Sequence, residues 1–576
     1  MFSTAWTTSE RAYGVVVERS VKIPMSDGIE LDADIFRPDA AGPFPAILGY
    51  HPYNQASQTA PIKPAALSIN IFRHANQEEG TAYIEAGDPA FYVRRGYAYL
   101  IANIRGTGNS GGIYPFLARR EIEDGCELIE WMARQPWCNG QVGMFGVSYF
   151  AWIQFFIASL NPPHLKCIFA PWGATDLYRD SVYHGGILGH GFWRMWAYGS
   201  LYKARVASET RQRLGEEAFG QAIAACLRDE DITRVPELAA ILRNPEQGMN
   251  PLLVDLLLNP CDGPYWEERR VNYPTINVPA YLGACWGIYG LHLPGAFRSW
   301  ENLSVPKKLV IGPPAYLDRP LYQLQYESLR WFDFWLKGIE TGILQEPPIR
   351  LFIPGEGTWK EANEWPLPET KWTPFHLHEG GVLFEREHWP NEGTTSFEDS
   401  PWGRGSLEFS TPLFVEQTEV IGPIVLKLFA SSTAPEALWF ISLRAVDAAG
   451  QERILTRGWL RGSHRRLDPQ RSKPWAPFFP HTQPEPLTPG EVTEFTIPLV
   501  PTCTLCKPGS RLVLKISCTD DPPKHPLEAL ASGHLHRASA SRITVHHNAE
   551  HPSHLLLPIT RGNVMGTFIS GGKPYL

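Results

Sequence analysis

Residues 141–152 read Q-V-G-M-F-G-V-S-Y-F-A-W, a largely apolar stretch interrupted by Gly146 and Ser148. We interpret Gln141–Phe145 as a buried strand and the residues after Ser148 as the start of a helix. Gly146 allows a tight turn and keeps side-chain bulk away from the serine. A serine on a sharp strand-to-helix turn is typical of a nucleophile, which needs a neighbouring group to take its proton.

The segments around this turn alternate between strands and helices. Short apolar runs at Ala46–Tyr50 and Tyr97–Asn103 predict strands, and Ile122–Gln135 has the periodicity of an amphipathic helix. The pattern resumes with predicted strands at Val278–Cys285 and Lys308–Gly312, followed by a helix through residues 326–336. This alternation predicts an α/β fold, with a parallel sheet covered by helices on both faces.

Two regions depart from this pattern. Between the strands, the sequence predicts only helices, at Glu209–Arg228, Pro236–Arg243 and Leu252–Leu258, and such an insert can cap the sheet edge where ligands bind. Near the C-terminus, short strand-like runs separated by Gly, Pro and Asp predict an antiparallel β sandwich. The predicted domains are an α/β domain of residues 1–175 and 273–345, a helical cap of residues 176–272, and a C-terminal β domain of residues 346–576.

Composition and charge exclude some classes of function. The formal net charge is −8 and no basic block stands out, which argues against a nucleic-acid partner. No run of about 18 apolar residues predicts a membrane span, and the N-terminus lacks the pattern of a secretory signal. Nine scattered cysteines indicate a reducing compartment. We therefore expect a cytoplasmic protein with a small-molecule substrate and no metal or cofactor, and leave a homodimer open.

A second element fits a serine nucleophile. The strand Ala46–Tyr50 runs into H-P-Y-N at 51–54. In α/β-hydrolases a loop after an early strand supplies one donor to the oxyanion, and the backbone N–H after the nucleophile supplies the other. The sequence therefore predicts the phenol of Tyr53 and the amide of Tyr149 as the two donors.

The chain resembles the CocE/NonD family of hydrolases, which includes cocaine esterase and X-Pro dipeptidyl-peptidase relatives. The resemblance covers nearly the whole length and implies an α/β-hydrolase domain, an inserted helical cap and a C-terminal jelly roll. It also implies that Ser148 is the nucleophile and that Tyr53 with the Tyr149 amide forms the oxyanion hole. The stretches that carry it are N-I-R-G-T-G-N-S-G-G at 103–112, E-D-G-C through G-V-S-Y at 123–149, S-L-R-W-F-D-F-W-L-K-G at 328–338, L-T-R-G-W-L-R-G-S-H-R at 455–465 and P-L-T-P-G-E-V at 486–492.

Two positions depart from the family pattern. Ile288 stands where the family's aspartate is expected, after Trp286, and Tyr316 stands where its histidine is expected, after Gly-Pro. Isoleucine cannot orient a base, and a phenol with a pKa of about 10 is a poor base at neutral pH. The best substitutes are His292 and His184. Other polar residues that could take part are His51, His190, Asp176, Asp180 and Asp318.

The aromatic content predicts an apolar substrate pocket, for which we select Trp152, Trp172, Trp286 and Tyr316. The favoured function is a serine hydrolase acting on an ester or amide of a bulky apolar small molecule. Two alternatives stay open at this point. One is a non-hydrolytic cyclase, lyase or isomerase that uses the same pocket, and the other is a ligand-binding pseudoenzyme.

Overall fold

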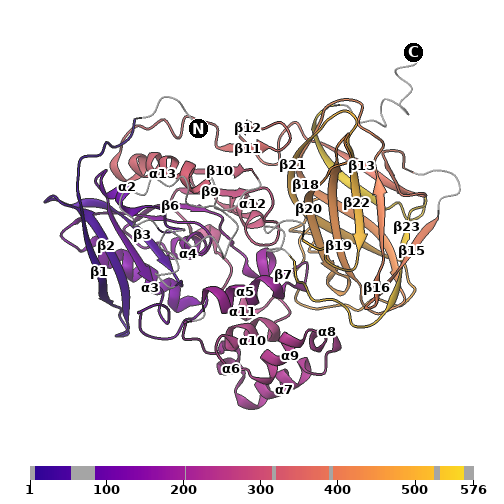
Figure 1. Cartoon of the computed structure of the whole chain (residues 1–576), viewed down its shortest axis with the longest axis horizontal. Helices are drawn as coiled ribbons and strands as arrows, with labels where there is room; N and C mark the ends of the chain where they lie inside the picture. The colour runs from indigo at the N-terminus through magenta and orange to yellow at the C-terminus, as the bar shows by residue number, and fades with distance from the viewer. Residues whose placement is uncertain are drawn as a thin grey trace.

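The computed structural model describes residues 7–53, 83, 85–201, 203–313, 320–387, 393–523 and 532–562. Its first sheet has ten strands in the order β1-β2-β4-β3-β5-β6-β9-β10-β11-β12, and the strands from β4 to β11 are parallel (Figure 1). The strand bounds are β1 Val15–Pro24, β2 Glu30–Pro38, β3 Phe44–His51, β4 Ala98–Asn103, β5 Cys138–Phe145, β6 Leu165–Pro171, β9 Ala280–Cys285, β10 Lys307–Gly312, β11 Ile349–Ile353 and β12 Thr358–Ala362.

Helices cover both faces of this sheet, as the sequence predicts. Helix α13 packs closely against β5, because a Cβ added to Gly143 would meet the ring of Phe332. Helices α3 and α4 pack against each other, with Gly125 of α3 close to the side chain of Ile157 of α4. No helix among the described residues is long and apolar enough to cross a bilayer. The helices against the sheet are α2 Pro89–Val93, α3 Arg119–Ala133, α4 Tyr149–Ala158, α12 Leu293–Asn302 and α13 Pro320–Lys337.

The insert between β6 and β9 is mostly helical and lies below the sheet in Figure 1. The predicted single helix over residues 209–228 is wrong, because Gly215 has φ +79° and separates two shorter helices. The insert begins with a short π-helix, η1 Tyr178–Val182, which is followed by a short hairpin of β7 Tyr183–His184 and β8 Ile187–Leu188. Its helices are α5 His190–Ser200, α6 Glu209–Leu214, α7 Glu216–Cys226, α8 Glu230–Thr233, α9 Pro236–Arg243, α10 Asn250–Leu258 and α11 Pro264–Glu267.

The C-terminal part forms a second, mostly antiparallel sheet of twelve strands among the described residues. Strand β24 lies at one end of the strand order and also pairs with β18, so the sheet curls back on itself as in a jelly roll. Its strands are β13 Lys371–His378, β14 Val382–Phe384, β15 Thr394–Ser400, β16 Gly403–Arg404, β17 Ser406–Ser410, β18 Thr418–Ser432, β19 Leu438–Val446, β20 Glu452–Arg461, β21 Thr493–Cys506, β22 Arg511–Ser517, β23 Ser541–His546 and β24 His554–Arg561.

The two sheets meet along an apolar contact. Leu438, Phe440, Trp459, Cys503 and Leu505 belong by sequence to the second sheet, yet they pack into the core of the first. Strands β11 and β12, which follow residue 345, also pair with the first sheet rather than the second. Burial of this surface favours a fixed arrangement of the two parts.

The turn after β5 places a serine at the start of α4. Ser148 has φ +58° and ψ −125°, a conformation that L-residues rarely adopt, and Gly146 has φ +145°. A Cβ on Gly146 would stand 2.3 Å from Cβ of Phe150 and 3.1 Å from the carbonyl oxygen of Glu85. The predicted strand–turn–helix is therefore confirmed, and it requires glycine at position 146.

Replacing Gly146 with alanine is expected to lower the free energy of unfolding by about 3 kcal/mol, because the overlap and the positive φ both oppose a side chain. Chemical denaturation measures this change. Gly220→Ala is the matched control, since an exposed glycine in α7 with open space around it should be neutral or gain about 0.5–1 kcal/mol. Equal stabilities of the wild type and Gly146→Ala would contradict the steric argument.

Candidate active site

Ser148 is only slightly exposed, and its hydroxyl makes no hydrogen bond to any other described residue. Its carbonyl oxygen accepts the backbone N–H of Trp152 at 2.9 Å, which starts α4. Phe150 occupies the position two residues after the serine where a second small residue is usual. Its ring fits because Gly49 of β3 has no side chain, and it stacks on His51 with 4.6 Å between ring centroids.

The two residues that carry the predicted oxyanion donors contact each other through their rings. Tyr53 follows β3, is 5% exposed, and its ring meets that of Tyr149 edge-on at 6.4 Å. Its carbonyl oxygen accepts Nδ2 of Asn103 at 2.6 Å, which fixes the residue at the end of the strand. The backbone N–H of Tyr149 lies in the first turn of α4, where a helix offers no acceptor of its own.

Glu85 is a residue of this site that the sequence did not indicate. Its carbonyl oxygen accepts the backbone N–H of Val147 at 3.0 Å, one residue before the serine, and its carboxyl group hydrogen-bonds the side chain of Tyr53. The other carboxyl oxygen, Oε2, is buried without a hydrogen-bond partner among the described residues. Burial raises the pKa of Glu85 well above its ordinary value and thus favours the neutral, protonated form of the group.

The Tyr53 hydroxyl therefore has two potential donors beside it. The indole N–H of Trp196, on helix α5 of the cap, approaches its oxygen at 3.4 Å, and a protonated Glu85 offers an O–H. When the Tyr53 oxygen accepts a hydrogen bond from Trp196 or Glu85, the hydroxyl proton of Tyr53 remains available to donate to another acceptor. This arrangement can present the Tyr53 O–H to a carbonyl oxygen of a bound substrate.

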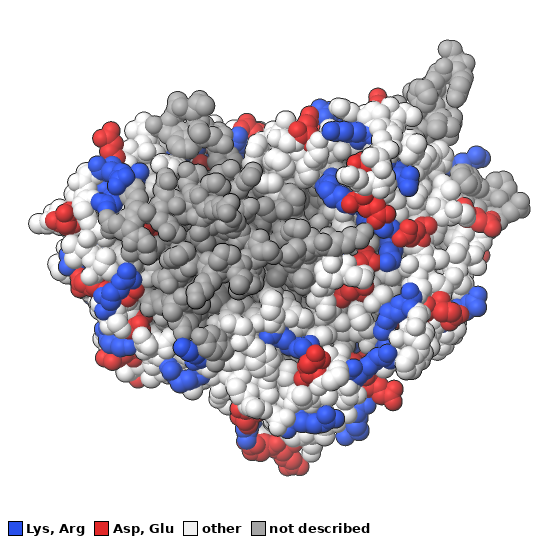
Figure 2. Space-filling model, in the orientation of Figure 1, with Lys and Arg blue, Asp and Glu red and all other residues white. Residues whose placement is uncertain are grey.

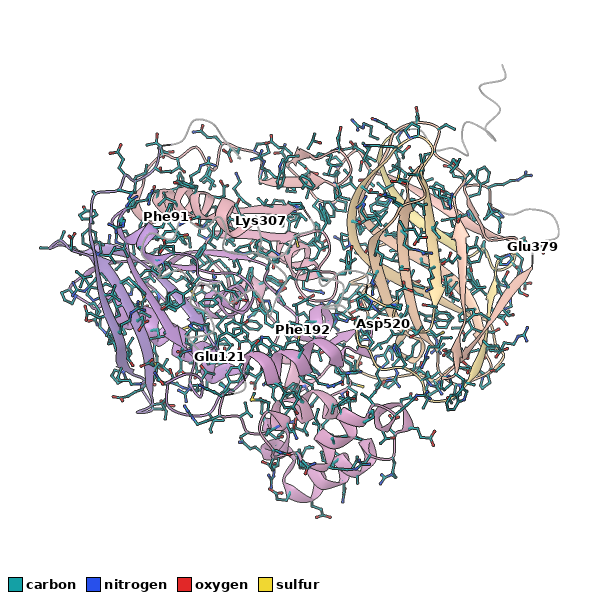
Figure 3. The ribbon with its side chains drawn as sticks, in the orientation of Figure 1. Phe91, Glu121, Phe192, Lys307, Glu379 and Asp520 are labelled. Atoms are coloured by element: carbon teal, nitrogen blue, oxygen red, sulfur yellow. The ribbon has the colours of Figure 1, made fainter. Side chains whose placement is uncertain are left out.

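A second buried carboxyl group supports the side chain of Tyr149. The Tyr149 hydroxyl donates to Oε1 of Glu121 at 2.7 Å and receives the hydroxyl of Tyr114 at 2.8 Å. Oε2 of Glu121 accepts the backbone N–H of Leu117 at 2.7 Å. Glu121 has no solvent exposure, and burial raises its pKa to about 8. Figure 3 shows it among side chains between the first sheet and the cap.

Three of the four histidines named from the sequence, His51, His184 and His292, are buried, and burial lowers the pKa of each to about 3. The fourth, His190, is partly buried at the start of α5, and burial lowers its pKa to about 4. His292 lies at the start of α12, and its Nδ1 accepts the indole N–H of Trp152 at 3.3 Å. Nδ1 of His51 accepts the Tyr53 N–H at 3.2 Å, and its Nε2 has no hydrogen-bond partner among the described residues. All three are thus neutral at pH 7, and none hydrogen-bonds Ser148.

His184 connects the parts of the chain. Its Nε2 lies 2.8 Å from the carbonyl oxygen of Gly290, and its Nδ1 lies 2.7 Å from Nε2 of His534 in the C-terminal part. Nδ1 of His534 in turn lies 2.9 Å from Oδ1 of Asp520. Both ring nitrogens of His184 are engaged, which leaves neither for Ser148 in this arrangement.

Three tryptophans were predicted from the sequence to line the substrate pocket, and all three are buried. Trp152 packs between Tyr149 and His292. Trp172 is buried after β6, with its backbone N–H donating to Gly283 at 2.6 Å, and the indole N–H of Trp286 donates to the Phe352 carbonyl at 2.7 Å.

Of the two positions that depart from the family pattern, the structure describes Ile288 but not Tyr316. Ile288 is fully buried in the loop after β9. Tyr316 lies outside the described residues, as does Asp318. Asp176 and Asp180 are held by arginines, Asp176 by Arg179 and Arg270 and Asp180 by Arg298, which is the structural role expected of cap residues.

The buried Glu121 makes stability depend on pH. Its pKa is about 8 in the folded state and 4.5 ordinarily, so between these values the folded protein holds a proton that the unfolded chain has released. The stabilisation is complete below pH 4.5 and is lost as pH rises through 8. Glu121 by itself should therefore lower the free energy of unfolding by up to about 1.4 kcal/mol per pH unit between pH 6 and 8.

Chemical denaturation of Glu121→Gln across this range should show a flatter pH dependence than the wild type, because glutamine does not titrate. Glu123→Gln is the control, since Glu123 lies on the same helix but is partly exposed and paired with Arg119. An unchanged pH slope in Glu121→Gln would contradict the assignment.

Comparison with known proteins places the chain in a family. The profile described as X-Pro dipeptidyl-peptidase (S15 family) matches residues 27–316, and that of the X-Pro dipeptidyl-peptidase C-terminal non-catalytic domain matches residues 341–556. Cocaine esterase from Rhodococcus sp. (strain MB1 Bresler) is 26% identical, over 95% of this chain and 99% of its own.

Solved structures agree with this placement. A CocE/NonD family hydrolase from Staphylococcus aureus superposes with a TM-score of 0.80 at 25% identity, over 95% of this chain and 94% of its own. An α-amino acid ester hydrolase, at 18% identity, shares the fold with a TM-score of 0.71 over 96% of this chain and 98% of its own. The chain is accordingly a member of the X-Pro dipeptidyl-peptidase (S15) family, with the α/β-hydrolase and jelly-roll fold of CocE/NonD hydrolases.

Proposed function

We propose that this protein is a serine hydrolase that cleaves an ester or amide bond in a bulky, apolar small molecule, with Ser148 as the nucleophile. The observation that carries the proposal is the strained turn that sets Ser148 at the start of α4, next to Tyr149, whose ring contacts that of Tyr53. Ser148 Oγ attacks the substrate carbonyl carbon, and the resulting oxyanion accepts the Tyr53 O–H and the Tyr149 N–H. Collapse expels the leaving group, and water then releases the acid from Ser148.

The surroundings of α4 support a bulky apolar substrate. The ring of Tyr149 stacks on Trp196 at 5.9 Å, and Trp152 meets Trp193 at 6.1 Å, so aromatic side chains from the cap face the helix that follows the serine. The related cocaine esterase takes its name from an ester of this general kind. We therefore favour a small-molecule ester over a peptide.

For the base we favour His292 over His184. His292 touches Trp152, one helical turn from Ser148, whereas both nitrogens of His184 are engaged with Gly290 and His534. Its Nδ1 now accepts the indole N–H, so its proton lies on Nε2. Taking the serine proton at Nε2 would require Nδ1 to become the protonated nitrogen, with loss of the 3.3 Å indole contact.

Fluorophosphonate labelling read by intact mass tests the nucleophile directly. The wild type should gain one adduct, Ser148→Ala should gain none, and Ser159→Ala, altered at the far end of α4, should label like the wild type. His292→Gln should slow labelling by about 100-fold, and His184→Gln much less. A wild type that hydrolyses esters while Ser148→Ala keeps full activity would overturn the proposal.

The proposal assigns Glu85 a positioning role through Tyr53. As a neutral acid, Glu85 donates to the phenol oxygen, and Tyr53 then donates its proton to the oxyanion. If Glu85 ionised, Tyr53 would donate to that carboxylate instead, and the oxyanion would lose one donor. Loss of a single such donor typically reduces kcat by about 10²–10³-fold.

Glu85→Gln should retain activity within a few-fold, because the amide still donates a hydrogen bond, whereas Glu85→Ala should lose about 10-fold or more. The distinguishing measurement is the pH profile of kcat. Wild-type activity should decline at alkaline pH as Glu85 ionises, and the decline should be absent in Glu85→Gln. Identical alkaline limbs in both proteins would show that Glu85 has only a structural role.

One observation favours a second candidate, an enzyme that uses the pocket without hydrolysis. The histidines described near the site are neutral and engaged, and Ile288 is apolar. Donors at Tyr53 and Tyr149 could still polarise a carbonyl for an elimination or isomerisation. In that case no adduct forms at Ser148, and Tyr53→Phe impairs turnover more than Ser148→Ala.

A further inference from the structure

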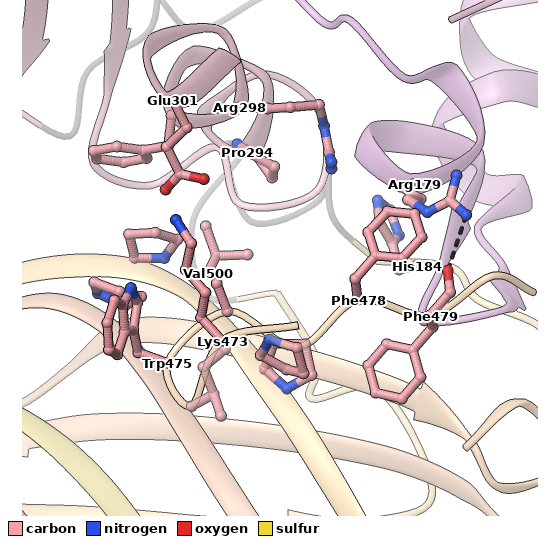
Figure 4. A pocket seen from close by; sticks show the side chains of 18 of the residues that line it. Arg179, His184, Pro294, Arg298, Glu301, Lys473, Trp475, Phe478, Phe479 and Val500 are labelled. Atoms are coloured by element: carbon pink, nitrogen blue, oxygen red, sulfur yellow. Dashed lines mark hydrogen bonds between the residues drawn. The ribbon is translucent and has the colours of Figure 1, made fainter. Parts of the chain in front are cut away.

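A pocket of about 520 Å³ lies between the α/β part and the C-terminal part of the chain, and we call it the interdomain pocket. Its walls are α12, the loop after β9, strands β20 and β21, and the proline-rich loop 473–481 (Figure 4). Ser148, Tyr53, Tyr149, Trp152 and His292 are not among its lining residues. The interdomain pocket therefore does not include Ser148, the oxyanion donors or the favoured base, although His184 lines it, and its volume is that of a typical small-ligand site.

The aromatic walls of the interdomain pocket are held rigidly from behind. Trp475 stacks on Trp372 with 5.2 Å between centroids and 13° between planes, and Phe297 stacks on Trp365 at 4.4 Å. Trp459 packs against His184 at 4.8 Å. Because each ring is fixed by another, the surface is preformed and loses little conformational entropy on binding a flat ligand.

The charges in the interdomain pocket are of two kinds. Arg179 and Arg298 are neutralised by carboxylates behind the wall, Arg179 by Asp176 and Asp262 and Arg298 by Asp180. By contrast, the side chains of Arg471, Lys473 and Glu301 form no hydrogen bond or close ion pair with another described residue. Figure 4 shows Lys473 and Glu301 pointing toward each other from opposite walls.

Apart from these buried pairs, the interdomain pocket carries two cations and one anion, a net excess of one positive charge, and Lys473 and Glu301 attract each other across it. Arg471 lies over the ring of Phe478 at 3.5 Å from its centroid, and Arg179 lies over the same ring at 4.7 Å, so two cations already contact one aromatic ring. A flat ring with a single negative charge matches both the rings and this excess.

We propose that the interdomain pocket binds a small aromatic carboxylate, with its ring among Trp475, Phe297 and Trp459 and its carboxylate attracted to Lys473 and Arg471. Glu301 opposes the anion and limits the charge that the site accepts. The assignment does not rest on Ser148 or on any catalytic activity.

Calorimetric titration of the full-length protein with 2-naphthoate and with neutral 2-naphthamide tests this proposal. 2-Naphthoate should bind at least 10-fold more tightly than 2-naphthamide at low salt, and the difference should shrink as salt is raised. Lys473→Met should weaken 2-naphthoate binding about 5- to 10-fold, whereas Glu301→Gln, on the opposite wall, should strengthen it. Trp475→Ala should weaken both ligands.

Two controls separate this site from the active site and from general charge effects. Ser148→Ala should bind 2-naphthoate like the wild type, and so should Lys166→Met, which removes a partly exposed lysine outside the interdomain pocket that donates a hydrogen bond to the Pro163 carbonyl. The proposal is overturned if millimolar 2-naphthoate does not bind, if 2-naphthamide binds equally well, or if Lys473→Met and Glu301→Gln change affinity in the same direction. Esterase activity should be unaffected by Lys473→Met.

Discussion

The conformation of one turn controls the rest of the candidate site. Ser148 can hold φ +58° only because β5 and α4 are fixed on either side and Gly146 leaves space for Phe150. The backbone N–H of Val147 within the turn is taken by the Glu85 carbonyl, so the same residue that holds the turn also holds the Tyr53 hydroxyl. A strained backbone conformation of this kind is maintained only where the packing and hydrogen bonds of the surrounding residues hold it in place.

The electrostatics of this site are those of a dry interior. Burial keeps Glu85 protonated, raises the pKa of Glu121 to about 8 and lowers the pKa of His51, His184 and His292 to about 3. The described groups near Ser148 are therefore hydrogen-bonding dipoles rather than ions. Fixed dipoles in a low-dielectric site stabilise a developing oxyanion strongly, whereas proton transfer to such weakly basic histidines is less favourable. Both tyrosines are supported by a buried carboxyl group.

The sequence predicted those features of the structure that depend on residues close together in the chain. The strand–turn–helix at Ser148 follows from Gly146, and the parallel sheet follows from alternating strand and helix patterns. Gly215 carried a signal for the break between α6 and α7 that a purely helical periodicity overlooks. Which sheet β11 and β12 join could not be predicted, because strands of both sheets share the same period. Glu85 could not be predicted either, since its role depends on Tyr53 and Val147 meeting it in space.

His184 shows why a candidate base cannot be chosen by residue type. Its partners Gly290 and His534 are 106 and 350 residues away along the chain, so no sequence window contains them. The Gly290 carbonyl can only accept, so Nε2 of His184 carries the proton and Nδ1 accepts from His534. Asp520 accepts from the other nitrogen of His534. His534 thus has a hydrogen-bond partner at each ring nitrogen, His184 on one side and Asp520 on the other.

The pKa shifts agree with this assignment. Burial alone would raise the pKa of Asp520, yet the adjacent His534 holds it well below its usual range. Burial, with a smaller contribution from His534, lowers the pKa of His184 to about 3. The His534–Asp520 pair in the C-terminal part therefore fixes the orientation of His184, and through it the Gly290 carbonyl, two residues before His292. The jelly roll thereby helps to position the loop that carries the favoured base.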